Sequence, residues 1–212
     1  MARFDPDSYS GLDRLGRVPL SASFHFREFL YSELAVHHKL RNVPDKERVD
    51  FAIEAGSRLC ALLLEPLQAR FGRIHVRSGY RSRAVNAAGV GKANCASDND
   101  GFHTWDHPSA KNGMGATACI SIPRVSRAIF AGTVPYEALA WWINDHLPDW
   151  SFVEFFATAD HSDEVCFNLG WHEISLKKMV TRRGGPQSLL TRMPPASERK
   201  ANIQTLLDNC AV

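Results

Sequence analysis

The stretch Ile74-His75-Val76-Arg77-Ser78-Gly79-Tyr80-Arg81-Ser82 decides the fold. Residues 74–77 alternate apolar and polar side chains, which predicts a half-buried β-strand that leads into a turn at Ser78-Gly79-Tyr80. Arg81 follows this turn, and a guanidinium there is a candidate for binding a carboxylate through two parallel hydrogen bonds. The alternative is an ordinary surface charge, and the strand and turn do not decide between the two roles.

Length and composition limit the classes of protein to which the chain can belong. Its 212 residues, of which 44% are hydrophobic and 23% charged, suffice for one sizeable core but are few for two independent domains. The net charge of +2, from 25 basic and 23 acidic residues, gives no field that attracts nucleic acid, so we expect no nucleic-acid partner. Five cysteines without CxxC spacing favour synthesis in a reducing compartment over a disulfide framework.

No segment has the hydrophobic length of a membrane span or of a secretory signal. No run approaches the ~18 consecutive apolar residues of a transmembrane helix. Residues 1–17 lack the continuous apolar core of a signal peptide. We therefore expect a protein without a membrane span that is synthesised in the cytoplasm without a signal peptide.

Around the opening strand, hydrophobic periodicity predicts both helices and strands, which indicates an α+β domain. Helices are expected over residues 23–34, 45–71, 136–147 and 197–209. Further strands are expected over residues 116–122, 152–156 and 165–169, the last two joined as a hairpin by the polar turn 160–164. Residues 171–176 either extend the last of these strands or start another. These elements divide the chain into an extended N-terminal arm (1–22), a domain (23–176) and a basic C-terminal tail with a helix (177–212).

The segment 89–115 carries most of the residue types that could support chemistry. It contains five glycines and almost no aliphatic residues, so it is expected to lie as a long loop across the surface of the scaffold. His103, Asp106, His107 and Asn112 lie within it, and long loops of this kind are often functional.

His103, Cys119 and His172 are the candidate zinc ligands. A hydrolytic zinc site uses three protein ligands and leaves one position open for water, and distant segments usually supply the ligands. Each of these residues also has an ordinary structural role available. His103 can be a loop histidine bonded to Asp106, and Cys119 can be a small buried hydrophobic residue. His172 and Glu173 point to opposite faces of a strand, so only one of them can face a given pocket.

Four short segments together resemble the zinc D-alanyl-D-alanine carboxypeptidases of peptidase family M15. They are Phe26-Arg27-Glu28-Phe29-Leu30, Leu64-Glu65-Pro66-Leu67, Val76-Arg77-Ser78-Gly79-Tyr80-Arg81-Ser82 and Asn86-Ala87-Ala88, and the resemblance covers residues 24–176. It implies the Hedgehog/DD-peptidase fold, in which a small antiparallel sheet packs against helices. It also implies a substrate-binding role for Arg81, which matches the arginine that binds the substrate carboxylate in the family, together with Ser78 and Tyr80. The implied ligand is a peptidoglycan stem peptide.

The family's zinc-binding pattern aligns with the later part of the chain in more than one way. Cys119 falls on the position of the aspartate ligand, and Asn112 falls on that of the first histidine when no gap is allowed. An insertion in the loop would give this role to His103. Glu173 falls on the position of the second histidine, and a one-residue bulge would restore His172 there.

Two functions follow from these alignments. One is a zinc-dependent peptidoglycan peptidase, of carboxypeptidase or endopeptidase type, with zinc on His103, Cys119 and His172 and with Glu173 or Asp106 accepting the proton of the zinc-bound water. The other is a metal-free, inactive module that binds the cell wall or serves in a virion. Peptidoglycan lies outside the cytoplasm, so the missing signal favours a bacteriophage setting, with virion proteins as partners or delivery to the cell wall during lysis.

Overall fold

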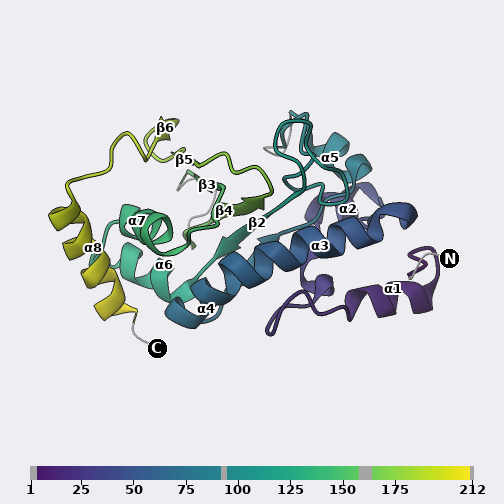
Figure 1. Cartoon of the computed structure of the whole chain (residues 1–212), viewed down its shortest axis with the longest axis horizontal. Coiled ribbons are helices and arrows are strands. Elements are labelled where there is room, and N and C mark those ends of the chain that lie inside the picture. The colour runs from purple at the N-terminus through teal and green to yellow at the C-terminus, as the bar shows by residue number, and fades with distance from the viewer. Residues whose placement is uncertain (1–3, 92–94, 158–163, 211–212) are drawn as a thin grey trace.

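A computed structural model describes residues 4–91, 95–157 and 164–210, and these form a mixed α+β structure around one six-stranded sheet (Figure 1). The order of strands in the sheet is β1-β2-β4-β3-β5-β6. Each neighbouring pair is antiparallel except β3 and β5, which are parallel. The strands are β1 (His75–Ser78), β2 (Gly115–Ser121), β3 (Phe152–Phe155), β4 (Phe167–His172), β5 (Lys178–Thr181) and β6 (Gln187–Ser188).

A long helical segment beside β2 provides much of the core (Figure 1). It consists of the 3₁₀ turn η2 (Lys46–Arg48), α3 (Val49–Leu59), the π-helical turn η3 (Cys60–Leu64) and α4 (Glu65–Phe71). The segment ends at Gly72, whose φ of 85° is a conformation that favours glycine. The predicted helix over residues 45–71 is therefore confirmed, with a π-helical turn just before Pro66.

The two faces of the sheet differ sharply in polarity. On β2, Ala116, Ala118 and Ile120 are fully buried in the core on the side of α3, whereas Thr117 and Cys119 alternate onto the opposite face. β4 alternates in the same way, with Phe167 and Leu169 in the core and a polar residue between them. The opposite face is free to carry a polar site, because the apolar side chains of these strands are already buried.

Shorter helices pack around this centre (Figure 1). At one end of the sheet α8 packs against α6 and α7, and at the other end α2 packs against α5. Their bounds are α1 (Tyr9–Gly16), the 3₁₀ turn η1 (Phe26–Phe29), α2 (Glu33–His38), α5 (Arg83–Gly89), α6 (Pro123–Phe130), α7 (Glu137–His146) and α8 (Ala196–Asn209).

Several sequence predictions differ from the structure. The N-terminal arm is not wholly extended, because it contains α1, which begins where the Ser8 hydroxyl accepts a hydrogen bond from the Gly11 amide. Neither α5 nor α6 was predicted. The C-terminal segment contributes β5 to the sheet, so the sheet is not purely antiparallel. β3 and β4 pair as the predicted hairpin does, but most of its turn, residues 158–163, lies outside the described residues.

The long loop is confirmed, although it does not lie only on the surface. Between α5 and β2 the described residues form isolated bridges and turns without a helix or a strand. Trp105 inserts from this loop into the core, where it is fully buried and its ring lies 5.2 Å from that of Phe29. The Arg81 amide donates to the carbonyl of His103, and the Thr117 amide donates to that of Phe102. These contacts hold the loop over the polar face of the sheet.

Candidate functional site

A row of polar side chains crosses four adjacent strands on the open face of the sheet. In register, Ser78 of β1 pairs with Cys119 of β2, Cys119 with Asn168 of β4, and Asn168 with Glu154 of β3. All four line one cavity of about 740 Å³. Its volume lies within the range of small-molecule and cofactor sites, about 300–1,000 Å³. We refer to this hollow below as the sheet cavity.

Arg81 borders the sheet cavity beside β1, and the turn holds its guanidinium in place. Its Nε and one terminal nitrogen donate to the Ser78 hydroxyl at 3.3 and 3.1 Å, and its other terminal nitrogen donates to Cys95 Sγ at 3.0 Å. A guanidinium carries five N–H groups, so these contacts leave one on each terminal nitrogen. No carboxylate of the described residues lies within 4.0 Å of the Arg81 nitrogens.

The two other arginines of the sheet cavity are arranged differently. Arg77 makes an ion pair with Glu164 at 2.9 Å, and Arg182 makes one with Glu154 at 2.8 Å. Because the charges of these two arginines are balanced within the protein, Arg81 is the best candidate among the three arginines for meeting a negative charge on a ligand. Lys178 also lines the sheet cavity and makes no ion pair with the described residues.

His103 lines the sheet cavity as a neutral imidazole. Its Nδ1 lies 2.8 Å from the Gly79 carbonyl, so this nitrogen carries the proton and Nε2 is left as an acceptor. Burial, followed by the nearby Arg81 charge, lowers the pKa of His103 to about 3. The alternative prediction for His103 was a loop histidine bonded to Asp106. His103 is a loop residue, but its hydrogen bond goes to the Gly79 carbonyl and not to Asp106.

Cys119 lies in the centre of the polar row as a protonated thiol. Its side chain is buried, and a hydrogen bond with Cys166, followed by burial, raises the pKa of the thiol well above its usual value. The thiolate that binds zinc is therefore disfavoured in this arrangement. The alternative prediction, that Cys119 is a small buried residue, agrees with its burial. Cys119 also lines the sheet cavity.

His172 is buried away from the polar row. It pairs with Gly115, four residues along β2 from Cys119, which corresponds to about 13 Å of strand. Its Nδ1 lies 3.0 Å from the Ser151 hydroxyl, and its ring packs on Phe102 at 4.4 Å between centroids. Burial lowers the pKa of His172 to about 4.

The two residues of the alternative alignment also bond elsewhere. Glu173 accepts a hydrogen bond from the Met114 amide at 3.2 Å. The side chain of Asn112 donates to the Ile174 carbonyl at 3.0 Å. Neither of them lines the sheet cavity.

The zinc site implied by the M15 resemblance does not fit these positions. Zinc holds its ligand atoms at about 2.0–2.3 Å, so the ligand atoms must lie close together. His103, Cys119 and His172 do not form a group whose ligand atoms all lie within 4.8 Å of one another in the described part of the chain. The structure brings His103 and Cys119 to one cavity and leaves His172 outside it.

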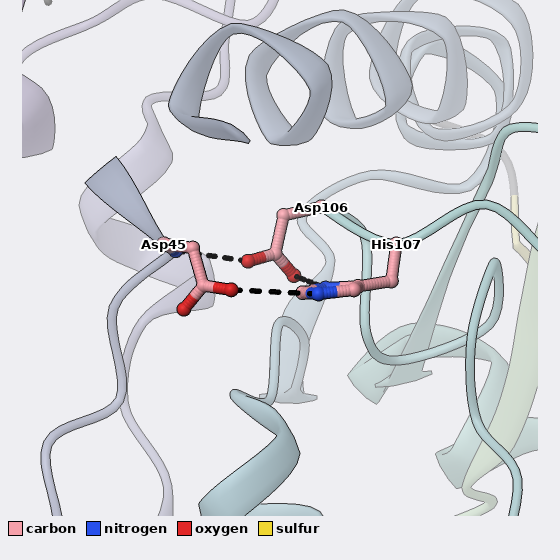
Figure 2. Close-up of side chains that lie close together, drawn as sticks. All are labelled: Asp45, Asp106 and His107. Carbon is pink, nitrogen blue, oxygen red and sulfur yellow. Dashed lines mark hydrogen bonds and ion pairs between the residues drawn. The ribbon is translucent and has the colours of Figure 1, made fainter. Parts of the chain in front are cut away.

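A different group could hold a metal, and Figure 2 shows its three side chains converging. The ligand atoms of Asp45, Asp106 and His107 all lie within 4.8 Å of one another. The two nitrogens of His107 face one carboxylate each, with Nε2 3.4 Å from Asp45 and Nδ1 3.1 Å from Asp106. Asp106 is thus not at the sheet cavity as a catalytic base. Tyr80 also points to this group, because its hydroxyl donates to Asp106 at 3.1 Å.

Sequence reasoning missed Asn168, Glu154 and Asp45. Asn168 and Glu154 each interrupt an apolar strand, between Phe167 and Leu169 and between Val153 and Phe155. A lone polar residue inside an apolar strand is a signal that could have marked the polar face. No local pattern connects Asp45 with Asp106 and His107, because more than 60 residues separate them.

Among the described residues, no helix combines the length and apolar character that a membrane crossing requires. Comparison of the chain with protein-family models, curated proteins and solved structures found no match.

Proposed function

We propose that the sheet cavity binds the carboxylate end of a peptide, with Arg81 as the anchoring residue, and that the chain acts as a metal-free binding module. The observation that carries this proposal is the state of Arg81. Three of its N–H groups are used to orient it, and two remain at a cavity wall with no carboxylate of the described residues within ion-pair distance. A carboxylate that accepts from both terminal nitrogens would make the strong bidentate pair typical of arginine.

The floor of the sheet cavity suits a peptide. The side-chain oxygens of Thr117 and Asn168 are buried there and have no hydrogen-bond partner among the described residues. Buried polar groups are usually bonded, so these oxygens favour a ligand that brings amide N–H groups. Phe102, Phe152 and Phe156 add apolar surface for small side chains.

The resemblance to peptidase family M15 supports a peptidoglycan stem peptide as the ligand and the Hedgehog/DD-peptidase fold as the scaffold. One of the segments that carry the resemblance, residues 76–82, contains Arg81, which lies on the cavity wall. A bacteriophage virion or a lysis pathway would bring such a module to the cell wall, and virion proteins would then be its partners.

Zinc-dependent peptide hydrolysis is the second candidate function, and one observation favours it. His103 and Cys119 lie at the same cavity as Arg81, as a peptidase site would require. A third ligand would have to move to them, because His172 is buried beside Ser151 and Phe102.

Calorimetry with a stem peptide ending in D-Ala-D-Ala tests the binding function. Arg81→Ala removes two charge-assisted hydrogen bonds, each worth about 1.5–3 kcal/mol, so we expect affinity to fall at least about 10-fold. Amidating the peptide's C-terminus should weaken binding to the wild type but not to Arg81→Ala. Arg58→Ala on α3, where the exposed arginine pairs with Glu54, is the matched control and should bind normally. Equal affinity of Arg81→Ala and wild type would refute the proposal.

The same peptide distinguishes hydrolysis from binding. A metal-free module releases no D-Ala, whether zinc or EDTA is added. Zinc-dependent release that is lost in both His103→Ala and Cys119→Ser would establish the peptidase instead.

A further inference from the structure

We propose that Asp45, Asp106 and His107 form a binding site for one divalent transition-metal ion, with zinc as the best-fitting cation. The site is separate from the sheet cavity, because none of the three residues lines that cavity. Metal binding there would not require a peptide in the sheet cavity. The site's two carboxylates and one imidazole approach one another from segments far apart in the sequence (Figure 2).

Asp106 is held as a ready ligand. One carboxylate oxygen accepts hydrogen bonds from the Tyr80 hydroxyl at 3.1 Å and from the Asp45 amide at 2.9 Å. Bonds of this kind to the outer oxygen orient a metal-binding carboxylate. The other oxygen, Oδ1, is fully buried, points toward His107 and has no hydrogen-bond partner among the described residues.

His107 also presents a buried atom that makes no hydrogen bond among the described residues. Its side chain is 8% exposed, and its Nδ1 lies 3.1 Å from Asp106 Oδ1. The two atoms are close enough to bond, yet neither makes a hydrogen bond. Buried polar atoms without hydrogen bonds are rare, and a cation between these two would satisfy both. Asp45 faces the other ring nitrogen, Nε2, at 3.4 Å, so its exposed side chain would turn toward Nδ1 to bind the same ion.

The donor set selects the class of ion. Calcium and magnesium prefer oxygen ligands, whereas an imidazole nitrogen beside carboxylates suits zinc and similar transition metals. Asp45 has a 63% exposed side chain and gives an ion access from solvent. Three protein ligands leave a fourth tetrahedral position for water.

The position of the site indicates what the ion would do. Asp45 directly precedes η2 and the long helix, whereas Asp106 and His107 belong to the loop before β2. An ion held by both segments would clamp the loop to the start of the helix. The same loop carries His103, which lines the sheet cavity, so the clamp would stabilise one wall of that cavity.

Zinc titration of the full-length, metal-stripped protein tests the site, with bound zinc measured by elemental analysis and stability by thermal unfolding. We expect one zinc ion per chain and a higher unfolding midpoint when zinc is present. Asp45→Asn should weaken zinc binding at least 10-fold and abolish the rise in midpoint. It is the informative variant, because the Asp45 side chain is exposed and its backbone amide still bonds to Asp106. Glu47→Gln, which makes the same change of charge two residues away at an exposed position, should behave as wild type.

Two further measurements separate this site from the cysteines of the sheet cavity. Cobalt bound at Asp45, Asp106 and His107 should lack the intense near-ultraviolet charge-transfer band that a thiolate ligand produces, and Cys119→Ser should leave metal binding unchanged. The proposal is overturned if the wild type takes up no zinc. It is also overturned if Asp45→Asn binds zinc as tightly as wild type, or if Cys119→Ser removes the bound ion.

Discussion

Gly79→Ala should destabilise the protein strongly, although it adds only one methyl group. The added Cβ would lie 2.7 Å from Phe29 Cβ, 2.8 Å from Phe29 Cδ1 and 3.0 Å from Phe29 Cα. Carbon atoms prefer a separation of about 3.5–4.0 Å, so one partner must shift by roughly 0.5–1 Å. Phe29 cannot shift easily. It is fully buried, its ring packs on Trp105, and its carbonyl accepts from the Tyr80 amide. Overpacking of this kind costs about 1–3 kcal/mol, and we expect the upper part of that range.

Urea unfolding followed by tryptophan fluorescence measures this cost. Gly16→Ala provides the control, because its Cβ would meet only the side chain of Arg27, at 3.3 Å and beyond, within a helix that favours alanine. We expect the control to unfold within about 1 kcal/mol of wild type. A Gly79→Ala protein as stable as this control would refute the reasoning, because the turn would then not be pressed against Phe29 as the structure has it.

Three other predictions concern buried or bonded polar side chains. The pKa values of His103 and His172, about 3 and about 4, lie below the usual 6.5, so both rings stay neutral in the folded protein while the unfolded chain takes up protons below pH 6.5. Stability should therefore be unaffected by these rings above pH 7 and fall with decreasing pH, by up to about 1.4 kcal/mol per pH unit for each ring. His172→Gln should reduce the slope, and a flat profile between pH 7 and 5 would contradict the assignment. Tyr80→Phe removes the hydroxyl that bonds to buried Asp106 and should cost about 1.5–3 kcal/mol in urea unfolding, whereas a loss under 0.5 kcal/mol would argue against that bond. Glu65→Ala removes a carboxylate that bonds to the hydroxyl and amide groups of two serines and should cost about 1–3 kcal/mol by the same assay, with an unchanged midpoint as the contrary result.

Much of the fold could be predicted from the sequence, because its main elements bury regular apolar faces. The helix over residues 45–71 and the strands beginning near residues 75, 115 and 152 follow from periodicity alone. α1 and α5 were missed because they have only eight and seven residues and depend on caps and tertiary contacts. The parallel pairing of β5 with β3 is a long-range contact that no local pattern predicts.

The candidate site was predicted only in part, for a related reason. The position of Arg81 beside β1 could be predicted from its place after a strand and a turn, and its carboxylate-binding role stays a prediction. Asn168 and Glu154 join it through the register of separate strands, and that register is set by the buried faces of the whole sheet. His172 was grouped with Cys119 because both residue types can bind zinc. On β4, however, His172 lies four residues beyond Asn168, the residue that pairs with Cys119.

The π-helical turn at Cys60–Leu64 determines where the long helical segment could lose one residue. The buried residues Ala55, Leu59, Leu63, Leu67 and Phe71 recur every four residues, and an ideal α-helix would turn this series roughly 160° away from its starting direction. The wider turn absorbs part of that rotation. A chain one residue shorter within Cys60–Leu64 should therefore close into a regular α-helix with both halves still facing the core, whereas the same deletion within Val49–Leu59 should rotate one half toward solvent. Comparing the unfolding midpoints of the two deletion variants would show whether the helix tolerates a change of length only at this turn.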